Sequence, residues 1–334
     1  FRSDLFAGVP IFFVISGFLV TKSFYECDGD IGRYIVNRSL RIYPALWVSF
    51  IVILVALFIG GAFGFADVLK SSFLKFQLYQ FIIGSEFWGG YISGYIYNWD
   101  NFYKIYPSGV YWTINVELGF YVLVPIVFSR AIRLRTALAN SVILASMVVS
   151  LWVGSVASEL NSSAPSFNTT GALANEPLPY FWLFLGGSAG YVNWERVRRV
   201  FEDRFIPWLA AYIMVGGIVA LVFEQPLAAL HTLTPLRVVA ALMLCGCVLS
   251  FAYSYRHLSE CLRGNDLSYG IYLYHMPLIF TLRFAGVMGI GILWLVVGCT
   301  TIVLAAASWF LIEKPMLRLK SGWAPRQGRG SPIG

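Results

Sequence analysis

The sequence predicts an all-α polytopic membrane protein, and three observations support this fold class. Of the 334 residues, 58% are hydrophobic and only 12% are charged, whereas soluble domains carry about 25% charged residues. Long apolar stretches recur along the whole chain. Aromatic residues make up 17%, which fits helices that end in Trp and Tyr at both membrane surfaces. The composition excludes a soluble enzyme, a disordered chain, a coiled coil and a small disulfide scaffold.

Spanning helices are expected wherever some 20 consecutive residues carry few or no charges. A shorter apolar stretch, 76–85, is expected to lie in the membrane interface. We therefore predict nine transmembrane helices in this chain, at 5–24, 42–62, 109–129, 136–156, 177–194, 206–223, 235–253, 267–284 and 287–312.

Lysine and arginine are distributed unevenly between the loops. If loop 25–41 faces the cytoplasm, that side holds 18 of the 24 basic residues, and such a bias sets orientation in the bilayer. The net charge of +7 is therefore explained by topology, and no nucleic-acid partner is expected. We predict one transmembrane domain over residues 1–320 and a disordered cytoplasmic tail, rich in Gly, Pro and Arg, over residues 321–334.

This orientation places Phe1 outside, directly before an apolar stretch. The first residues, Phe1-Arg2-Ser3-Asp4, do not have the pattern of a signal peptide. We expect one more spanning helix upstream, which would bring the complete protein to about ten and restore an even count. The alternative is a processed end.

Glu117 is a carboxylate well inside an apolar stretch, about 12 Å deep at 1.5 Å per residue. An ionisable residue at that depth is costly and marks a functional site by default. Thr113 lies one turn away on the same helix face, so the two form a polar stripe. The alternative is a structural carboxylate that pairs with an arginine of a neighbouring helix.

His275 is the histidine that lies well inside a predicted span. Ser268, Tyr272 and His275 share one helix face. Pro277 leaves a backbone carbonyl one turn earlier without its helical donor, so a side chain or water must satisfy it. Histidine can serve as a general base near neutral pH. A buried histidine that only bonds a neighbour is the alternative.

Arg38 and Arg41 are spaced i, i+3 just before the second predicted span. Two guanidinium groups on one face can bind phosphates bidentately, or they can anchor the chain to anionic lipid. In the first span, Ser16 and Gly17 are small enough for close helix approach. The five cysteines form no CxxC pair, and we expect reduced thiols and no metal site.

Four separated segments resemble, in order and spacing, the motifs of acyltransferase family 3, the integral-membrane O-acyltransferases. The resemblance covers essentially the whole chain. The segments are Val9 to Leu19 with Phe12-Phe13 and Ser16-Gly17-Phe18; Arg38-Ser39-Leu40-Arg41-Ile42-Tyr43-Pro44; Trp112-Thr113 with Glu117, Phe120-Tyr121 and Pro125; and Ser268-Tyr269 with Tyr272-Leu273 and His275.

The resemblance implies a bacterial inner-membrane enzyme that moves an acetyl or other short acyl group from cytoplasmic acyl-CoA to a carbohydrate hydroxyl. Acceptors in the family include O-antigen, capsule, exopolysaccharide, Nod-factor and antibiotic sugars. Acyl-CoA, most simply acetyl-CoA, would be a co-substrate, and no bound cofactor is expected. The family's catalytic histidine lies on a helix upstream of these motifs, so His275 occupies a different position.

On this basis the expected site combines catalytic and substrate-binding side chains. The catalytic candidates are Glu117 and His275. The substrate-binding candidates are Arg38, Arg41, Ser16, Tyr43, Trp112, Thr113 and Tyr272. Aromatic residues between Phe87 and Trp112 could stack on sugar faces or form an interfacial belt.

Two functions from other classes compete with acyl transfer. A transporter or flippase for a lipid-linked sugar would show paired broken helices in two related halves, and the sequence shows no inverted repeat. A non-catalytic scaffold of a polysaccharide-assembly complex would need no catalytic histidine. A histidine on an upstream helix would favour the enzyme over the scaffold.

Overall fold

The computed structural model describes residues 8–59, 64–83, 111–131, 136–163, 177–223, 235–255, 257, 260, 263–284 and 290–320. Over these residues all regular elements are helical, so the chain is an all-α polytopic membrane protein, as predicted. Each of the nine predicted stretches contains a helix, and the stretch 76–85 overlaps α4 (Ser71–Ile83). The predicted tail, 321–334, lies outside the described residues.

Five of the described helices are long and apolar enough to cross a membrane. In two further apolar helices the parts that the structure describes fully, Phe205–Val219 and Val238–Ser254, are shorter. The predicted span 177–194 contains a 3₁₀ turn and then α9 of only 12 residues, about 18 Å long against a hydrocarbon core of about 30 Å. The five long segments are Gly8–Glu26, Ile31–Val55, Trp112–Ser129, Thr136–Glu159 and Trp294–Arg318.

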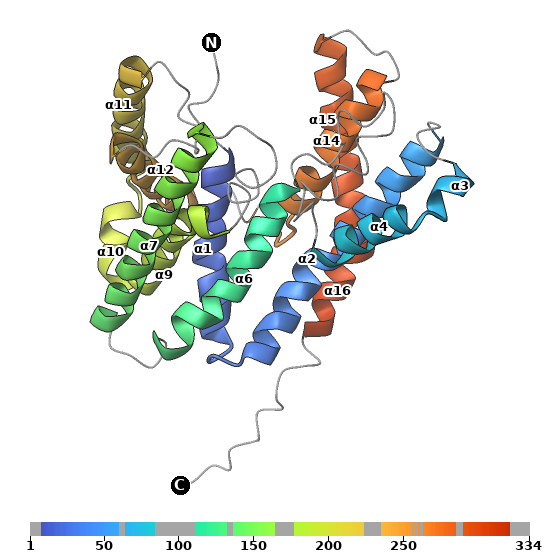
Figure 1. Ribbon diagram of the computed structural model, residues 1–334. Coiled ribbons are helices and arrows are strands. Elements are labelled where there is room, and N and C mark those ends of the chain that lie inside the picture. Colours follow the sequence, from blue (N-terminus) through green and yellow to red (C-terminus); the bar gives the residue numbers. More distant parts are fainter. Residues whose placement is uncertain are drawn as a thin grey trace. The chain divides into compact units, whose positions relative to one another are not determined.

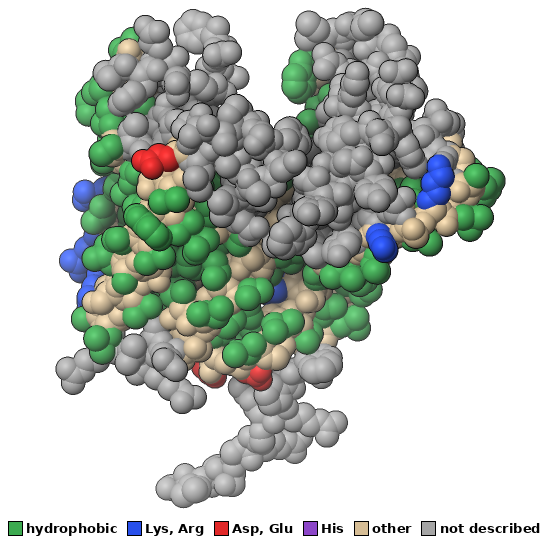
Figure 2. All heavy atoms as spheres, viewed as in Figure 1, with side chains coloured by type: hydrophobic (Ala, Val, Ile, Leu, Met, Phe, Trp, Pro, Cys, Tyr) green, Lys and Arg blue, Asp and Glu red, His purple; other side chains and the backbone are tan. Residues whose placement is uncertain are grey.

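The surface of these helices is apolar, as a lipid-facing surface requires. Hydrophobic side chains cover much of the described part of the face drawn in Figure 2. Ile126 and Trp152, on two of the long helices, are each more than 60% exposed. In water such a surface would be a large aggregation-prone patch, whereas in a bilayer it contacts acyl chains. The exposed apolar surface therefore agrees with the composition argument.

The helices belong to two compact units, each described here by itself. Unit 1 contains eight described elements: α1 (Gly8–Glu26), α6 (Trp112–Ala131), α7 (Thr136–Ser163), η1 (Leu178–Tyr180), α9 (Phe181–Val192), α10 (Trp194–Phe201), α11 (Phe205–Phe223) and α12 (Pro235–Ser254).

Within unit 1, α1 packs along α9 (Figure 1). A Cβ atom added at Gly17 would lie 1.9 Å from the carbonyl oxygen of Phe184, and one at Gly187 would lie 2.0 Å from that of Val14. Only glycine permits this backbone approach, so the predicted role of the small residues in the first span is confirmed. The contact fixes the face of α1 that carries Ser16.

Unit 2 is built around the long helix α2, which packs against α14, the π-helix η2 and α16. Its described elements are α2 (Ile31–Ile59), α3 (Phe65–Val68), α4 (Ser71–Ile83), α14 (Ser268–Phe284), α15 (Ile290–Ser308), η2 (Trp309–Glu313) and α16 (Lys314–Arg318).

Helix α2 begins eleven residues earlier than the predicted span 42–62, because its start is set by Asp30. The Asp30 Oδ1 accepts a hydrogen bond of 3.1 Å from the backbone N–H of Arg33, as an N-cap residue does. Pro44 lies inside the helix and does not end it. The arginine pair is therefore part of the same helix as the span and does not precede it.

Pro277 likewise lies inside α14 and leaves the carbonyl of Leu273 without its helical donor. The hydroxyl of Tyr111, which is almost completely buried, lies 3.1 Å from that carbonyl oxygen and donates to it. The expectation that a side chain must satisfy this carbonyl is met by Tyr111. This bond ties α14 to the residue that precedes α6.

Candidate functional site

Glu117 is the sixth residue of α6, because the helix begins at Trp112. The side chain lies about 8 Å along the helix from its start, less deep than the 12 Å expected from a span that begins at residue 109. The residue is only 7% exposed. A carboxylate that is withdrawn from water needs hydrogen-bond donors to offset its lost hydration.

Two hydroxyl groups donate to the same oxygen of Glu117. The Ser16 hydroxyl on α1 lies 3.0 Å from Oε1, and the Tyr121 hydroxyl, one turn along α6, lies 2.8 Å from it. Hydrogen bonds to an ionised acceptor are about twice as strong as neutral ones. The pair holds the carboxylate in one orientation and brings the predicted residues Ser16 and Glu117 together.

Thr113 and Trp112 complete the predicted residues of unit 1. Thr113 is buried in α6, as its place on the Glu117 face predicts. The ring of Trp112 packs between aromatic neighbours, with centroids 6.5 Å from that of Phe13 and 5.6 Å from that of Tyr180. In this structure Trp112 supports the aromatic core beside Glu117, and its role toward a substrate stays a prediction.

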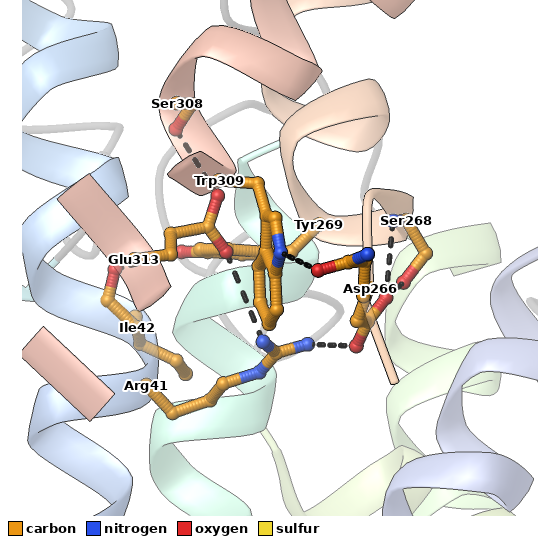
Figure 3. A network of polar contacts seen from close by, with 9 residues as sticks. Arg41, Ile42, Asp266, Ser268, Tyr269, Ser308, Trp309 and Glu313 are labelled. Atoms are coloured by element: carbon orange, nitrogen blue, oxygen red, sulfur yellow. Dashed lines mark hydrogen bonds and ion pairs between the residues drawn. The ribbon is translucent and has the colours of Figure 1, made fainter. Parts of the chain in front are cut away.

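In unit 2, Arg41 is the centre of a charged network drawn in Figure 3. Its guanidinium forms an ion pair with Asp266, the residue two positions before α14, and lies 3.8 Å from Oε2 of Glu313 at the end of η2. Glu313 is only 1% exposed. The contacts bring together three segments of unit 2 that are far apart in the sequence: α2, the residues before α14, and η2.

Aromatic rings and an amide fix the position of this arginine. The guanidinium carbon lies 5.9 Å from the ring centroids of Tyr269 and of Trp309, within the range of a cation–π contact. The Trp309 indole N–H and the Lys314 ammonium both donate to Oδ1 of Asn265, at 2.9 and 3.0 Å. Arg41 is therefore held by two aromatic rings and two carboxylates.

Asp266 also caps α14. Its Oδ1 accepts hydrogen bonds from the backbone N–H of Ser268 at 3.1 Å and from the Ser268 hydroxyl at 2.5 Å. Burial alone raises the pKa of this carboxyl, but the charge of Arg41 and the two bonds from Ser268 outweigh it and lower the pKa below its ordinary value. The Asp266 carboxylate is thus ionised at neutral pH.

The other predicted residues on α2 are Arg38 and Tyr43. Arg38 is partly exposed on α2, one turn before Arg41. The Tyr43 hydroxyl donates at 2.7 Å to the carbonyl of Ile82, and the neighbouring Trp47 donates at 2.8 Å to that of Phe81. Both bonds join side chains of α2 to backbone carbonyls of α4. Tyr43 therefore anchors α4, and its role in substrate binding stays a prediction.

His275 lies on α14 with Tyr272, and their ring centroids are 5.9 Å apart. The His275 Nδ1 is 2.8 Å from the carbonyl oxygen of Tyr272 and 3.1 Å from that of Ile271. A carbonyl can only accept, so Nδ1 carries the proton, and in the neutral ring Nε2 keeps its lone pair. The geometry therefore leaves Nε2 as the nitrogen that could act as a base.

The predicted residues thus form separate groups within the two units. Ser16 and Glu117 meet in unit 1, while Arg41 and the Tyr272–His275 pair belong to unit 2. Among the described residues no group of three or more His, Cys, Asp or Glu could hold a metal ion.

Tyr121, Asp266 and Glu313 were not predicted from the sequence as members of these groups. Tyr121 is four residues after Glu117, a spacing that could have indicated the contact. Asp266 stands two residues before a serine that begins a helix, a capping pattern that could also have been noticed. Glu313 lies one position beyond the apolar stretch 287–312, and no local pattern singles it out.

Comparisons with known proteins show the family to which this chain belongs. The family model described as an acyltransferase domain, Acyl_transf_3, matches residues 5–313. The chain is similar to Nodulation protein 10 of Rhizobium leguminosarum bv. viciae, with 35% identity over 325 residues, 96% of this chain and 84% of the relative. It is also similar to "Putative acetyltransferase ORF330" of Acidianus two-tailed virus, with 21% identity over 284 residues, 84% of this chain and 75% of that protein. No solved structure matches the chain significantly.

The matched region includes all four motifs that carry the resemblance, and the long apolar helices give the membrane setting. The chain therefore belongs to acyltransferase family 3 and is a membrane acyltransferase.

Proposed function

We propose that this chain transfers an acetyl or another short acyl group from acyl-CoA to a hydroxyl of a cell-surface or secreted carbohydrate. The observation that carries the proposal is the buried Glu117 carboxylate, which accepts hydrogen bonds from Ser16 and Tyr121 inside a spanning helix. A carboxylate kept in such a place at a cost to stability is expected to serve the reaction.

The chemistry requires a base and an attacking hydroxyl. The acceptor oxygen attacks the carbonyl carbon of the thioester, a C–O bond forms, and the C–S bond breaks. The hydroxyl proton passes to the base and then to the departing sulfur of CoA. Glu117 and the Nε2 of His275 are the two candidates for the base.

A covalent route would use Ser16 as an acyl carrier. The Ser16 hydroxyl donates to Glu117, which is the arrangement of a nucleophile next to its base. The acyl group would pass from CoA to Ser16 Oγ and then to the sugar. To separate this route from direct transfer, the reaction is quenched with acid during turnover and the Ser16 peptide is measured by mass spectrometry. Only the covalent route adds the mass of the acyl group to that peptide.

The donor would bind through its phosphates at Arg38 and Arg41. Both arginines lie one turn apart on α2, and a guanidinium binds phosphate oxygens bidentately. The charge bias of the loops supports a cytoplasmic position for this end of α2 and for the C-terminus. We accordingly place the protein in the cytoplasmic membrane of a bacterium, with acyl-CoA approaching from inside.

The acceptor would approach from the opposite face. Trp112, Thr113 and Tyr272 are the candidates for contacts with the sugar, because aromatic rings stack on apolar sugar faces. The aromatic residues between 87 and 110 lie outside the described residues. The relative from Rhizobium leguminosarum is named a nodulation protein, and this name supports an acceptor of the Nod-factor class among those of the family.

Purified full-length protein tests the proposal directly. Radiolabelled acetyl-CoA is incubated with a panel of oligosaccharides, and both labelled sugar and free CoA thiol are measured. We expect one labelled sugar per thiol released, with the wild type only. If folded protein releases no thiol and labels no sugar in any condition, acyl transfer to carbohydrate is wrong, and a transport assay in liposomes then tests the flippase alternative.

The donor site is tested by Arg41→Lys. Lysine keeps the positive charge beside Glu313 but loses the planar fork and the ring contacts. We expect the affinity for CoA to fall about tenfold, corresponding to one charge-assisted hydrogen bond. Arg196→Lys on α10, an exposed arginine in unit 1, is the matched control and should bind CoA as the wild type does. An unchanged affinity in Arg41→Lys would remove the assignment.

A further inference from the structure

We propose that Asp266 is an internal competitor for the anionic donor: its carboxylate occupies the outer edge of the Arg41 guanidinium, and a phosphate group displaces it when the donor binds. Glu313 remains as the permanent counter-charge of Arg41. The inference rests on the proposed function in one respect, namely that the anion is a phosphate of acyl-CoA.

The two carboxylates on Arg41 occupy unlike positions. Glu313 is 1% exposed, and its Oε1 accepts a hydrogen bond of 3.1 Å from Ser308 five residues earlier in the same segment. The Asp266 side chain is 44% exposed. A buried carboxylate cannot leave a guanidinium without a large desolvation cost, whereas an exposed one gains water when it leaves. The partner that can be exchanged is therefore Asp266.

Asp266 has a second set of partners that it can keep. Its Oδ2 contacts Arg41, while Oδ1 is bound by the N–H and the hydroxyl of Ser268. A rotation of the carboxyl group away from Arg41 leaves the cap of α14 in place. The exchange therefore breaks one ion pair and does not require α14 to lose its N-terminal hydrogen bonds.

The guanidinium is ready to accept a replacement anion. The ring centroids of Tyr269 and Trp309 lie 5.9 Å from its central carbon, and Oε2 of Glu313 lies 3.8 Å from Nη1. These contacts do not involve Asp266, so Arg41 keeps its place when Asp266 leaves. Because the fold already holds the Arg41 side chain in one position, anion binding costs little further conformational entropy of this side chain.

The charge balance of the network also favours exchange over addition. Two carboxylates, those of Asp266 and Glu313, already lie beside Arg41. A phosphate added beside Arg41 would meet the nearby Asp266 carboxylate and be repelled. Displacement of Asp266 removes that repulsion. Because the Arg41–Asp266 ion pair must break first, the wild type binds the donor less tightly than a protein without this pair would.

The test is Asp266→Asn in the full-length protein, with CoA binding measured by calorimetry. Asparagine keeps an oxygen that can accept from Ser268 but loses the charge, so the affinity for CoA should rise about two- to fivefold, the value of a partly exposed ion pair. Damage to the fold would weaken binding, so a gain separates competition from a structural role. Glu202→Gln, which breaks the partly exposed Arg198–Glu202 pair of unit 1, is the control and should leave affinity unchanged.

A second measurement does not depend on the identity of the donor. Phenylglyoxal modifies accessible arginines, and mass spectrometry reads the extent at Arg41. We expect faster modification of Arg41 in Asp266→Asn, and protection by inorganic pyrophosphate at lower concentrations than in the wild type. If pyrophosphate protects in this way but CoA binds neither protein, the exchange stands and acyl-CoA as donor is wrong. If neither the protecting concentration nor the CoA affinity changes in Asp266→Asn, the competitor role is overturned.

Discussion

The hydroxyl of Ser16 donates a hydrogen bond of 3.0 Å to Oε1 of Glu117, across 101 residues of sequence. The contact joins the first described helix to the helix that carries the buried carboxylate. It depends on the close approach of α1 to its neighbours, which glycines permit. Two motifs that are far apart in the sequence thus meet in one polar group.

Replacing Glu117 by Gln should reduce acyl transfer about 100- to 10,000-fold, the usual contribution of a general base. Glutamine keeps an oxygen that can accept from Ser16 and Tyr121, so the fold should survive. Initial rates with acetyl-CoA measure the effect, and Glu195→Gln on the exposed start of α10 is the control. Wild-type rates in Glu117→Gln would leave Glu117 with a structural role alone.

His275→Asn tests whether Nε2 of His275 acts as the base. The asparagine amide can donate where Nδ1 now donates to the carbonyl of Tyr272, but nothing replaces Nε2. We expect the melting temperature in detergent to change little and the transfer rate to fall about 100-fold or more. A variant with normal rates shows that His275 only bonds its own helix.

The Tyr111–Leu273 bond should account for a measurable part of the stability of unit 2. Tyr111→Phe leaves the carbonyl at the Pro277 break unpaired, at a cost of about 1–3 kcal/mol. In Pro277→Ala the new N–H can donate to the same carbonyl, so Tyr111→Phe should cost less in that background. A double-mutant cycle on unfolding free energies measures the coupling, and a coupling of zero would contradict the role given to Tyr111.

Gly187→Ala should destabilise unit 1 by about 1–3 kcal/mol, since its Cβ would lie 2.0 Å from the carbonyl oxygen of Val14. Gly217→Ala on α11 is the matched control, because a Cβ there meets nothing within 4 Å. Thermal unfolding in detergent compares the two. Equal melting temperatures for both variants would mean that α1 and α9 are not as close as described.

Local patterns were sufficient to predict most of the helices. Apolar runs located α1, α6, α7 and α15. The i, i+4 spacing put Thr113 and Glu117 on one helix face, and in the structure both are buried. The start of α2 was missed because the predicted span was taken from a stretch without charges, which begins only after Arg41, whereas the Asp30 cap lies further upstream. The predicted span 177–194 was also longer than the helix, because α9 in this apolar stretch is a buried helix of only 12 residues.

Long-range contacts could not be predicted in the same way. The Arg41–Asp266 pair spans 225 residues, and nothing in either local segment specifies the other. Arg41 was predicted to bind phosphate, but its internal carboxylate partners become visible only when α2 meets Asp266 before α14 and Glu313 at the end of η2. Spacing identifies residues on one helix face, whereas partners on different helices depend on packing.

Transfer across a membrane by one protein is the central claim, and sealed proteoliposomes test it most directly. The oligosaccharide that accepts the label is trapped inside, radiolabelled acetyl-CoA is added outside, and the label on the trapped sugar is counted. We predict labelled sugar with the wild type and a background count with Glu117→Gln. Label that appears only when sugar and acetyl-CoA share one side of the membrane would contradict the account.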